Sequence, residues 1–163
     1  MSDFGLTRDQ ALVLINRHVT SENLLKHSLA TEAVMVGLAE RLNEDVETWG
    51  LVGLLHDLDF DETKDTPRKH TLVASEILLE NNVPEKYVKA IMSHNEEIPG
   101  WQSRNTTLEH ALACSEAITG LVVATALVMP DKKLASVKPT SVKKRMNMSA
   151  FARNVDRDAV REC

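Results

Sequence analysis

The sequence predicts an all-α protein, a single-domain helical bundle. Three observations support this prediction: the chain has 163 residues, hydrophobic residues make up 43% of it, and aromatic residues make up only 4%. A chain of this length buries roughly 70% of its unfolded surface, enough for one core, and an aliphatic core favours packed helices. We expect one domain over residues 1–163, with its core at about 16–130 and a helical extension at 131–163.

The first half of the chain carries three helix-start signals. Thr7 with Gln10 forms a capping-box pattern for a helix that ends near His18, and Ser21 can cap a second helix that runs to about Leu42. Asp45 can cap a third helix, 46–57, whose second half is apolar on every side. We therefore expect this third helix to run through the middle of the fold.

The second half predicts three more main helices, which makes about six in all. Residues 59–69 are polar and predict a loop, near whose end Thr66 and Pro67 start a fourth helix, because proline fits the first helical position. Pro84 likewise opens a fifth helix, which ends near His94. Thr106 with Glu109 forms a second capping box, for a long helix that stops at Met129-Pro130. Short helices are expected after Thr140, Ser149 and Asp156.

Charge and cysteine content limit the classes of partner. The formal charge of −5 opposes general attraction to nucleic acid or to an anionic membrane, so neither partner is expected. Cys114 and Cys163 give no disulfide framework, which favours a cytoplasmic location. The longest nearly apolar run, 117–129, is shorter than the roughly 20 residues that a membrane span needs. We therefore interpret this run as part of a core helix, although the same aliphatic helix could also form the seam of a homodimer.

The pair His56-Asp57 is the strongest chemical signal, because it ends the most apolar predicted helix. An ionised aspartate is costly to bury unless it is paired or binds a metal. For Asp57 alone, a carboxylate that accepts hydrogen bonds at a helix end is the ordinary interpretation. The case for a metal site rests on further residues near the ends of other predicted helices.

Those further residues are His27, His70, His94 and Glu116, an acid inside a long apolar helix. Imidazole and carboxylate are the usual ligands of Zn, Fe, Mn and similar ions, and helical bundles often build such sites from several helices. A lone histidine is more often structural, and His18 and His110 are interpreted in that way. We expect one or two divalent metal ions, with Fe, Mn, Zn and Mg not distinguished.

The order of these residues resembles the HD superfamily of metal-dependent phosphohydrolases, named for its histidine-aspartate pair. The stretch Gly53-Leu54-Leu55-His56-Asp57-Leu58-Asp59 is similar to the core signature of that family. The resemblance extends to small stand-alone proteins of the HDIG type, over about residues 16–158. It is carried there by the segments 23–27, 62–65, 118–121 and 129–134.

The resemblance implies that His27, His56 and Asp57 bind one metal and that Glu116 takes the place of the usual closing aspartate. In two-metal members, two further histidines hold a second ion and the aspartate of the pair bridges; His70 and His94 match that arrangement. Two features depart from the family. Glu116 is one methylene longer than aspartate, and the lysine that often follows the pair closely is absent, Lys64 and Lys69 being the nearest.

The implied activity is hydrolysis of a phosphate ester in a nucleotide or other phosphorylated metabolite by metal-activated water. His56 and Asp57 are its catalytic residues, and Lys64, Lys69 or Arg68 could neutralise the phosphate, although a solvated surface is the ordinary role of such lysines. Asp59, Asp61, Ser115 and Thr119 are candidates for supporting the ligands, although loop caps or solvated charges are the ordinary interpretation of Asp59 and Asp61. Residues 95–97 could orient substrate, but a polar helix terminus is the favoured interpretation of this segment. The alternatives are a degenerate module that binds metal or nucleotide, and a di-iron oxygenase.

Overall fold

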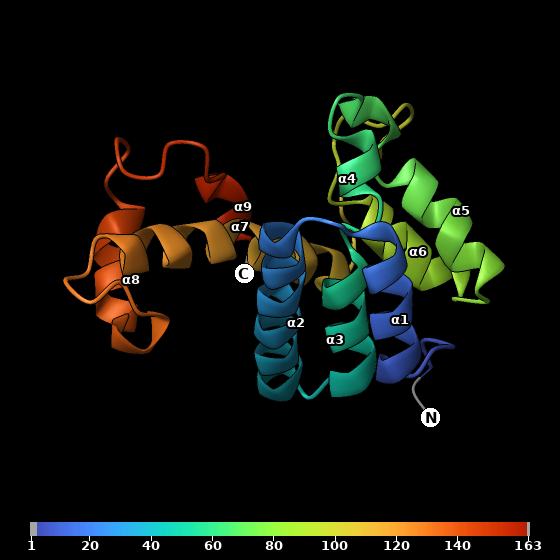
Figure 1. Ribbon diagram of the computed structural model, residues 1–163, viewed down its shortest axis with the longest axis horizontal. Coiled ribbons are helices and arrows are strands. Elements are labelled where there is room, and N and C mark those ends of the chain that lie inside the picture. The colour runs from blue at the N-terminus through green and yellow to red at the C-terminus, as the bar shows by residue number, and fades with distance from the viewer. Residues whose placement is uncertain (1–2, 163) are drawn as a thin grey trace.

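The computed structural model describes residues 3–162, and every regular element in that range is helical. Figure 1 shows α2 and α3 side by side with α1 next to them, while α7 crosses the far side of this group and reaches α8. The all-α prediction is therefore confirmed. The elements in chain order are α1 (Arg8–His18), α2 (Glu22–Leu42), α3 (Val46–Leu55), α4 (Phe60–Thr63), η1 (Pro67–Lys69), α5 (Leu72–Glu80), α6 (Glu85–Met92), α7 (Thr107–Leu127), η2 (Leu134–Ser136), α8 (Pro139–Met146) and α9 (Arg157–Arg161).

The predicted helix starts in the first half are confirmed. Thr7 and Gln10 form the expected capping box, the Ser21 hydroxyl accepts from Leu24 N, and Asp45 accepts from the amides of residues 47 and 48. Every residue of α3 from 48 to 55 is buried, which places this helix in the middle of the fold as predicted. Each cap satisfies amides that lack partners within the helix, so it fixes where the helix begins.

The close contact between α2 and α3 depends on Gly53. A Cβ atom at this position would lie 2.9 Å from Met35 Cγ, 3.0 Å from Thr31 O and 3.1 Å from Glu32 Cα. Two of these three atoms belong to the backbone and cannot move aside cheaply. Glycine therefore allows the backbones of α2 and α3 to approach, and this approach brings the start of α2 to the end of α3.

The region 59–71 differs from the prediction. The expected loop contains the short helix α4, and Pro67 opens only the 3-10 turn η1 before α5 begins at Leu72. Thr71 has a φ of 70°, a left-handed conformation that a right-handed helix cannot pass through. The prediction of a helix starting at Pro67 was therefore wrong. The break leaves His70 between two helical elements instead of within one.

The long helix α7 begins at its predicted capping box, Thr106 with Glu109. By length and composition it is the one helix in residues 3–162 that is long and apolar enough to cross a membrane. Half of its most apolar window is buried inside the fold, where α7 contacts α2, α3, α6, α8 and α9. The first half of α7 thus forms part of the wall behind the predicted site.

The C-terminal extension contains α8 and α9, which start near Thr140 and after Asp156 as predicted. The helix expected after Ser149 is absent from the described residues, which show turns and bends there. Arg157 accounts for this, because its guanidinium donates to the carbonyl groups of Met146, Met148, Ala152 and Val155 and would lose these acceptors in a helix. The expectation about disulfides involves Cys163, which lies outside the described residues.

Candidate metal centre

Four histidines and one aspartate converge on a small volume that we call the metal centre: His27, His56, Asp57, His70 and His94. Their ligand atoms form two groups, His27 with His56 and Asp57, and Asp57 with His70 and His94, within which all ligand atoms lie within 4.8 Å of one another. The structure thus brings together five of the six residues predicted as metal ligands. Asp57 belongs to both groups.

The two carboxylate oxygens of Asp57 face different groups. Oδ2 lies 3.5 Å from His27 Nε2 and 3.3 Å from His56 Nε2. Oδ1 lies 3.3 Å from His70 Nε2 and 3.5 Å from His94 Nε2. Asp57 follows the buried end of α3 and is itself 6% exposed, so its orientation is fixed by the core. One carboxylate therefore joins two sets of imidazole nitrogens.

All four imidazoles present Nε2 to the centre because Nδ1 has a partner on the other side of the ring. Nδ1 of His56 lies 2.8 Å from Gly53 O, Nδ1 of His94 lies 2.6 Å from Ile91 O, and Nδ1 of His70 lies 2.8 Å from Asp59 Oδ1. Carbonyl and carboxylate oxygens only accept, so each of these Nδ1 atoms carries the proton. Nε2 is then the atom that can bind a metal.

His27 is oriented from α7. Thr119 Oγ1 lies 2.6 Å from Glu116 O and 3.1 Å from His27 Nδ1. Since the hydroxyl proton goes to the carbonyl oxygen, the hydroxyl oxygen accepts from His27 Nδ1. Thr119 therefore gives His27 the same protonation pattern as the other three histidines.

Asp59 and Asn95 hold the segment around His70. Asp59 is 1% exposed, and besides His70 it accepts from the amide of Ala74 at the start of α5. Asn95 Nδ2 donates to the carbonyl oxygens of Pro67 and His70. Asp59 thus contacts His70, one of the predicted metal ligands. Asp61 instead accepts from Thr20 and Ser21 at the start of α2 and lies outside the centre.

The pKa shifts reflect the same geometry. Burial raises the pKa of Asp57, but the charge and hydrogen bond of His56, with hydrogen bonds from His70 and His94, hold it well below its usual range. Burial lowers the pKa of His70, yet Asp57 and Asp59 outweigh it and raise this pKa to about 9. The pKa of His56 is also raised, because Asp57 outweighs burial, whereas burial and His56 lower that of His27.

The spacing of the nitrogen atoms tests whether a metal fits. His27 Nε2 lies 3.2 Å from His56 Nε2, and His70 Nε2 lies 3.0 Å from His94 Nε2. Two unprotonated nitrogens at this distance repel each other unless a proton or a cation lies between them. Ligands held at about 2.1 Å from one ion, at tetrahedral or octahedral angles, lie about 3.0–3.4 Å apart. Both pairs match this spacing, so the residues fit two divalent ions.

Glu116 lies next to the centre but outside both donor groups. It lines a cavity of about 410 Å³ together with His27 and His94, and its charge acts on His27 and His56. Its carboxylate is not among the atoms that lie within 4.8 Å of one another. The structure therefore places this predicted ligand at the cavity wall.

The predicted phosphate-binding lysines lie elsewhere. Lys64 and Lys69 are exposed, and neither is among the residues that line the cavity beside the centre. These lysines belong to the segment 59–71, in the short helix-containing region between α3 and α5. Among the described residues that line the cavity, Arg104 is the one lysine or arginine. Sequence reasoning did not single out Arg104, because it lies in a polar loop without a motif.

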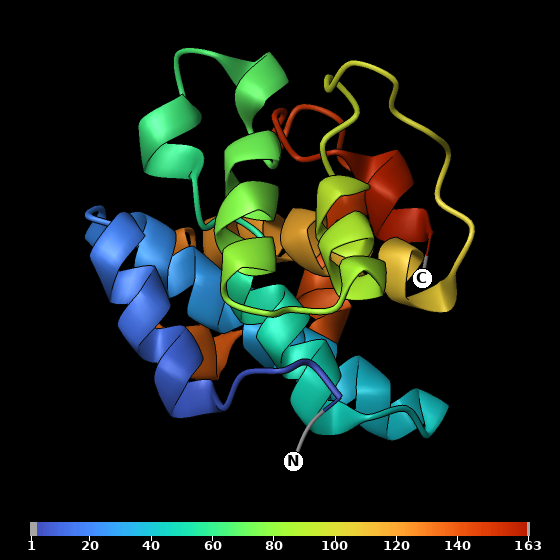
Figure 2. The ribbon, with the colours of Figure 1, turned by 90° about the vertical axis from the view of Figure 1, so that its right-hand side faces the viewer.

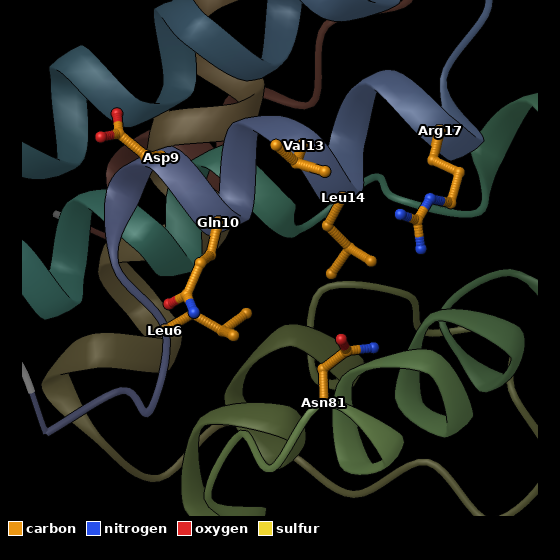
Figure 3. Close-up of a pocket in the computed structure, with 7 residues that line it drawn as sticks. All are labelled: Leu6, Asp9, Gln10, Val13, Leu14, Arg17 and Asn81. Atoms are coloured by element: carbon orange, nitrogen blue, oxygen red, sulfur yellow. The ribbon is translucent and has the colours of Figure 1, made fainter.

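The C-terminal extension forms part of the same cavity. Its lining includes Asn154, Val155, Asp156 and Ala159, and of these Val155 approaches α7 at Gly120. A second cavity, along α1, is lined by Val13, Leu14 and other side chains of that helix, by Leu6 before it, and by Asn81 across from them (Figure 3). None of the four histidines of the metal centre lines it. The metal centre therefore borders the first of these two cavities and not the second.

Comparisons with known proteins agree with this site. Residues 24–116 match the model of a protein family described as HD domain. Ribonuclease Y of Lawsonia intracellularis (strain PHE/MN1-00) is 29% identical over 77 residues, which cover 47% of this chain and 15% of the relative. Ribonuclease Y of Nitratidesulfovibrio vulgaris (strain DP4) is 27% identical over 100 residues, 61% of this chain and 18% of the relative.

The chain spans less than a fifth of the length of these curated relatives. No solved structure matches it significantly. The matched family segment runs from Leu24 in α2 to Glu116 in α7 and so contains every residue of the metal centre.

Proposed function

This chain belongs to the HD domain family, and on that basis we propose that it is a metal-dependent phosphohydrolase acting on a nucleotide or another phosphorylated metabolite. The observation that carries the proposal is Asp57, whose two oxygens face two separate pairs of imidazole nitrogens. Divalent ions at such a site supply charge that polarises a phosphoryl oxygen and makes water a usable nucleophile near neutral pH.

Within the proposal, the protein's own residues fix the charge and the protons of the centre. His27, His56, His70 and His94 offer one neutral nitrogen each, while Asp57 offers two oxygens. His56 and Asp57 are the proposed catalytic residues, because both are buried and held by the end of α3. Asp57, with its strongly lowered pKa, stays ionised at neutral pH and can orient a water that lies beside it.

Glu116 is proposed as the sixth ligand. Its position on α7 faces the cavity beside His27, and Thr119 connects its backbone carbonyl to the same histidine. A glutamate reaches further than an aspartate and has more rotamers, so its carboxylate can meet a charge at the centre by rotating within the cavity. We expect Glu116→Gln to weaken metal binding less than His27→Ala, since the four imidazoles remain.

The proposed partner is a small phosphorylated ligand, and the proposed location is the cytoplasm. No membrane partner is proposed, and a homodimer is the proposed assembly if α7 pairs with a second copy. The body of the protein is acidic, with 10 lysine and arginine residues against 20 aspartate and glutamate residues in positions 1–130. This charge disfavours a nucleic-acid polymer at the metal centre.

RNA is nevertheless the second candidate substrate. The observation in its favour is that two relatives, matched over 77 and 100 residues of this chain, bear the name Ribonuclease Y. Residues 131–162 add nine lysine and arginine residues against four acids, so this extension has the opposite charge to the body. An assay with single-stranded RNA therefore belongs beside the assays with small phosphate esters.

The test is a release assay for inorganic phosphate with the protein loaded in turn with Mn, Fe, Zn or Mg. The substrates are a panel of nucleotides and phosphorylated metabolites, and Asp57→Ala is the inactive control. We expect release by the wild type that the variant lacks. Release equal to that of the variant on every substrate would remove the hydrolase proposal. Activity that requires iron and oxygen would indicate an oxygenase, and nucleotide binding without turnover would indicate a binding module.

A further inference from the structure

Arg104 is a buried cation in the wall of the cavity beside the metal centre. It lies in the loop between α6 and α7, its side chain is 8% exposed, and it lines the cavity together with His94. Among the lining residues it is the one lysine or arginine, whereas Glu96, Glu97, Glu116 and Asp156 are acids. An anion that binds to this wall would therefore bind at the Arg104 guanidinium.

The guanidinium has more capacity to donate than the protein uses. Nη1 donates to Glu96 Oε1 at 3.0 Å and to Glu162 Oε1 at 3.1 Å, and Nη2 donates to Glu96 Oε1 at 3.0 Å. Nε is buried and has no hydrogen-bond partner in residues 3–162. A buried donor without a partner costs free energy, so one donor of this guanidinium is available to a further acceptor when its neighbours move.

Glu162 can leave Arg104 without losing all its partners. Its other oxygen, Oε2, lies 2.7 Å from His110 Nδ1, on the outer side of α7. Glu96 Oε1, in contrast, accepts from both Nη1 and Nη2 of Arg104. A new anion at Arg104 would face two carboxylates unless one moves away, and Glu162 is the one that retains a second donor.

Glu162 also connects α9 to the loop that holds Arg104. It directly follows α9, and Ala159 within that helix lines the cavity. The contact between Arg104 and Glu162 therefore joins α9 to the loop that precedes α7. An anion that binds the Arg104 guanidinium in place of Glu162 would lie at the edge of the cavity that Arg104, His94 and Ala159 line.

We propose that Arg104 binds a second anionic group of the substrate, in exchange for Glu162, while the reacting phosphate lies at the metal centre. The proposal rests on the proposed function and narrows its substrate class. The substrate is a phosphate ester with a further phosphate or carboxylate on the part that becomes the leaving group. A guanidinium suits both groups, because its N–H donors match their paired oxygens.

Two matched pairs of ligands test this proposal and separate the two kinds of anion. Glycerol 3-phosphate and 3-phosphoglycerate differ in a carboxylate, and adenosine 5′-monophosphate and adenosine 3′,5′-bisphosphate differ in a phosphate. Affinity for the metal-loaded full chain is measured by calorimetry, and kcat and KM are measured wherever phosphate is released. For at least one of the two pairs, we expect the wild type to bind the two-anion ligand with at least about 10-fold higher affinity than the single-anion ligand.

Three variants decide whether Arg104 binds the second anion. Arg104→Gln should lose about 10- to 100-fold in affinity for the two-anion ligand and stay within about twofold for the single-anion ligand. Arg161→Gln is the matched control, because Arg161 lies on α9, is exposed and pairs with Asp158. It should bind both ligands as the wild type does. Glu162→Gln should bind the two-anion ligand more tightly, because it removes the competing carboxylate.

A merely structural role for Arg104 predicts a different pattern. If the contact with Glu162 only holds α9 in place, Arg104→Gln and Glu162→Gln would both weaken binding, and they would do so for both kinds of ligand. That pattern, or a wild type without preference for a second anion, would overturn the proposal. Selective binding without any phosphate release would instead contradict the proposed hydrolase activity and leave the Arg104 site in place.

Discussion

Thr119 Oγ1 and His27 Nδ1 lie 3.1 Å apart, although 92 positions separate the two residues in the chain. Thr119 belongs to α7 and His27 to α2, and the contact fixes which ring nitrogen of His27 carries the proton. The metal centre therefore depends on the packing of α7 against α2. The two helices contact each other directly, and in Figure 2 α7 (gold to orange) passes behind α5 and α6 (green).

Removal of the Thr119 hydroxyl should weaken metal binding. In Thr119→Val, His27 Nδ1 loses its acceptor and the ring can adopt the other protonation state, so we expect about 10- to 100-fold lower affinity at the group that contains His27. Thr119→Ser keeps the hydroxyl and should stay near the wild-type affinity. Competition with a chelator of known affinity measures the metal affinity of both variants. Equal metal affinities of Thr119→Val and the wild type would refute the role of Thr119 in orienting His27.

Asp59 and Asp61 offer a matched pair of aspartates two positions apart. Asp59→Asn removes the charge that faces His70 Nδ1, and we expect about 10- to 100-fold weaker binding at the His70–His94 group. Asp61→Asn affects only contacts at the start of α2 and should leave metal affinity unchanged. Metal titrations of both variants provide the measurement. Equal losses in the two variants would mean that general destabilisation is the cause.

The pKa of His70 predicts how pH acts on the metal-free protein. This pKa is raised from 6.5 to about 9, so the folded state holds the proton more tightly than the unfolded state does. The resulting stabilisation is complete below about pH 6.5 and is lost as the pH rises through about 9. The Tm of the metal-free protein should therefore fall between these pH values, and the fall should be smaller in His70→Gln.

Much of the metal centre could be predicted from the sequence because helix ends are marked locally. The caps at Thr7, Ser21, Asp45 and Thr106 fixed where helices begin, and they placed His27 and His56 correctly near helix ends. His70 was placed in the wrong element, because its position depends on the hydrogen bonds that it donates to Asp59 and accepts from Asn95, which no local pattern marks.

The cavity wall beyond the metal centre could not be predicted. Arg104 and Glu162 are 58 positions apart and meet only when α9 packs against α7. Neither residue belongs to a motif, and a charged residue in a polar segment is ordinarily solvated. Lys64 and Lys69 were chosen for their closeness in sequence to His56-Asp57, but neither of them lines the cavity.

Gly53 gives a test of the packing that positions His56. In Gly53→Ala the added Cβ would meet Met35 and the backbone of α2 at 2.9–3.1 Å, so we expect a loss of about 1–3 kcal/mol in the free energy of unfolding. Gly37→Ala is the control, because a Cβ there meets nothing within 4 Å in the middle of α2. It should gain about 0.5–1 kcal/mol. Urea unfolding of both variants measures the difference.

The content of tightly bound metal tests the central claim most directly. The untagged protein is supplemented in turn with Mn, Fe, Zn and Mg, dialysed, and measured by elemental analysis beside His70→Ala and Asp57→Ala. Because Asp57 joins two donor groups, we expect up to two ions per chain in the wild type, one in His70→Ala, and the greatest loss in Asp57→Ala. A wild-type protein that retains none of these metals would contradict the account.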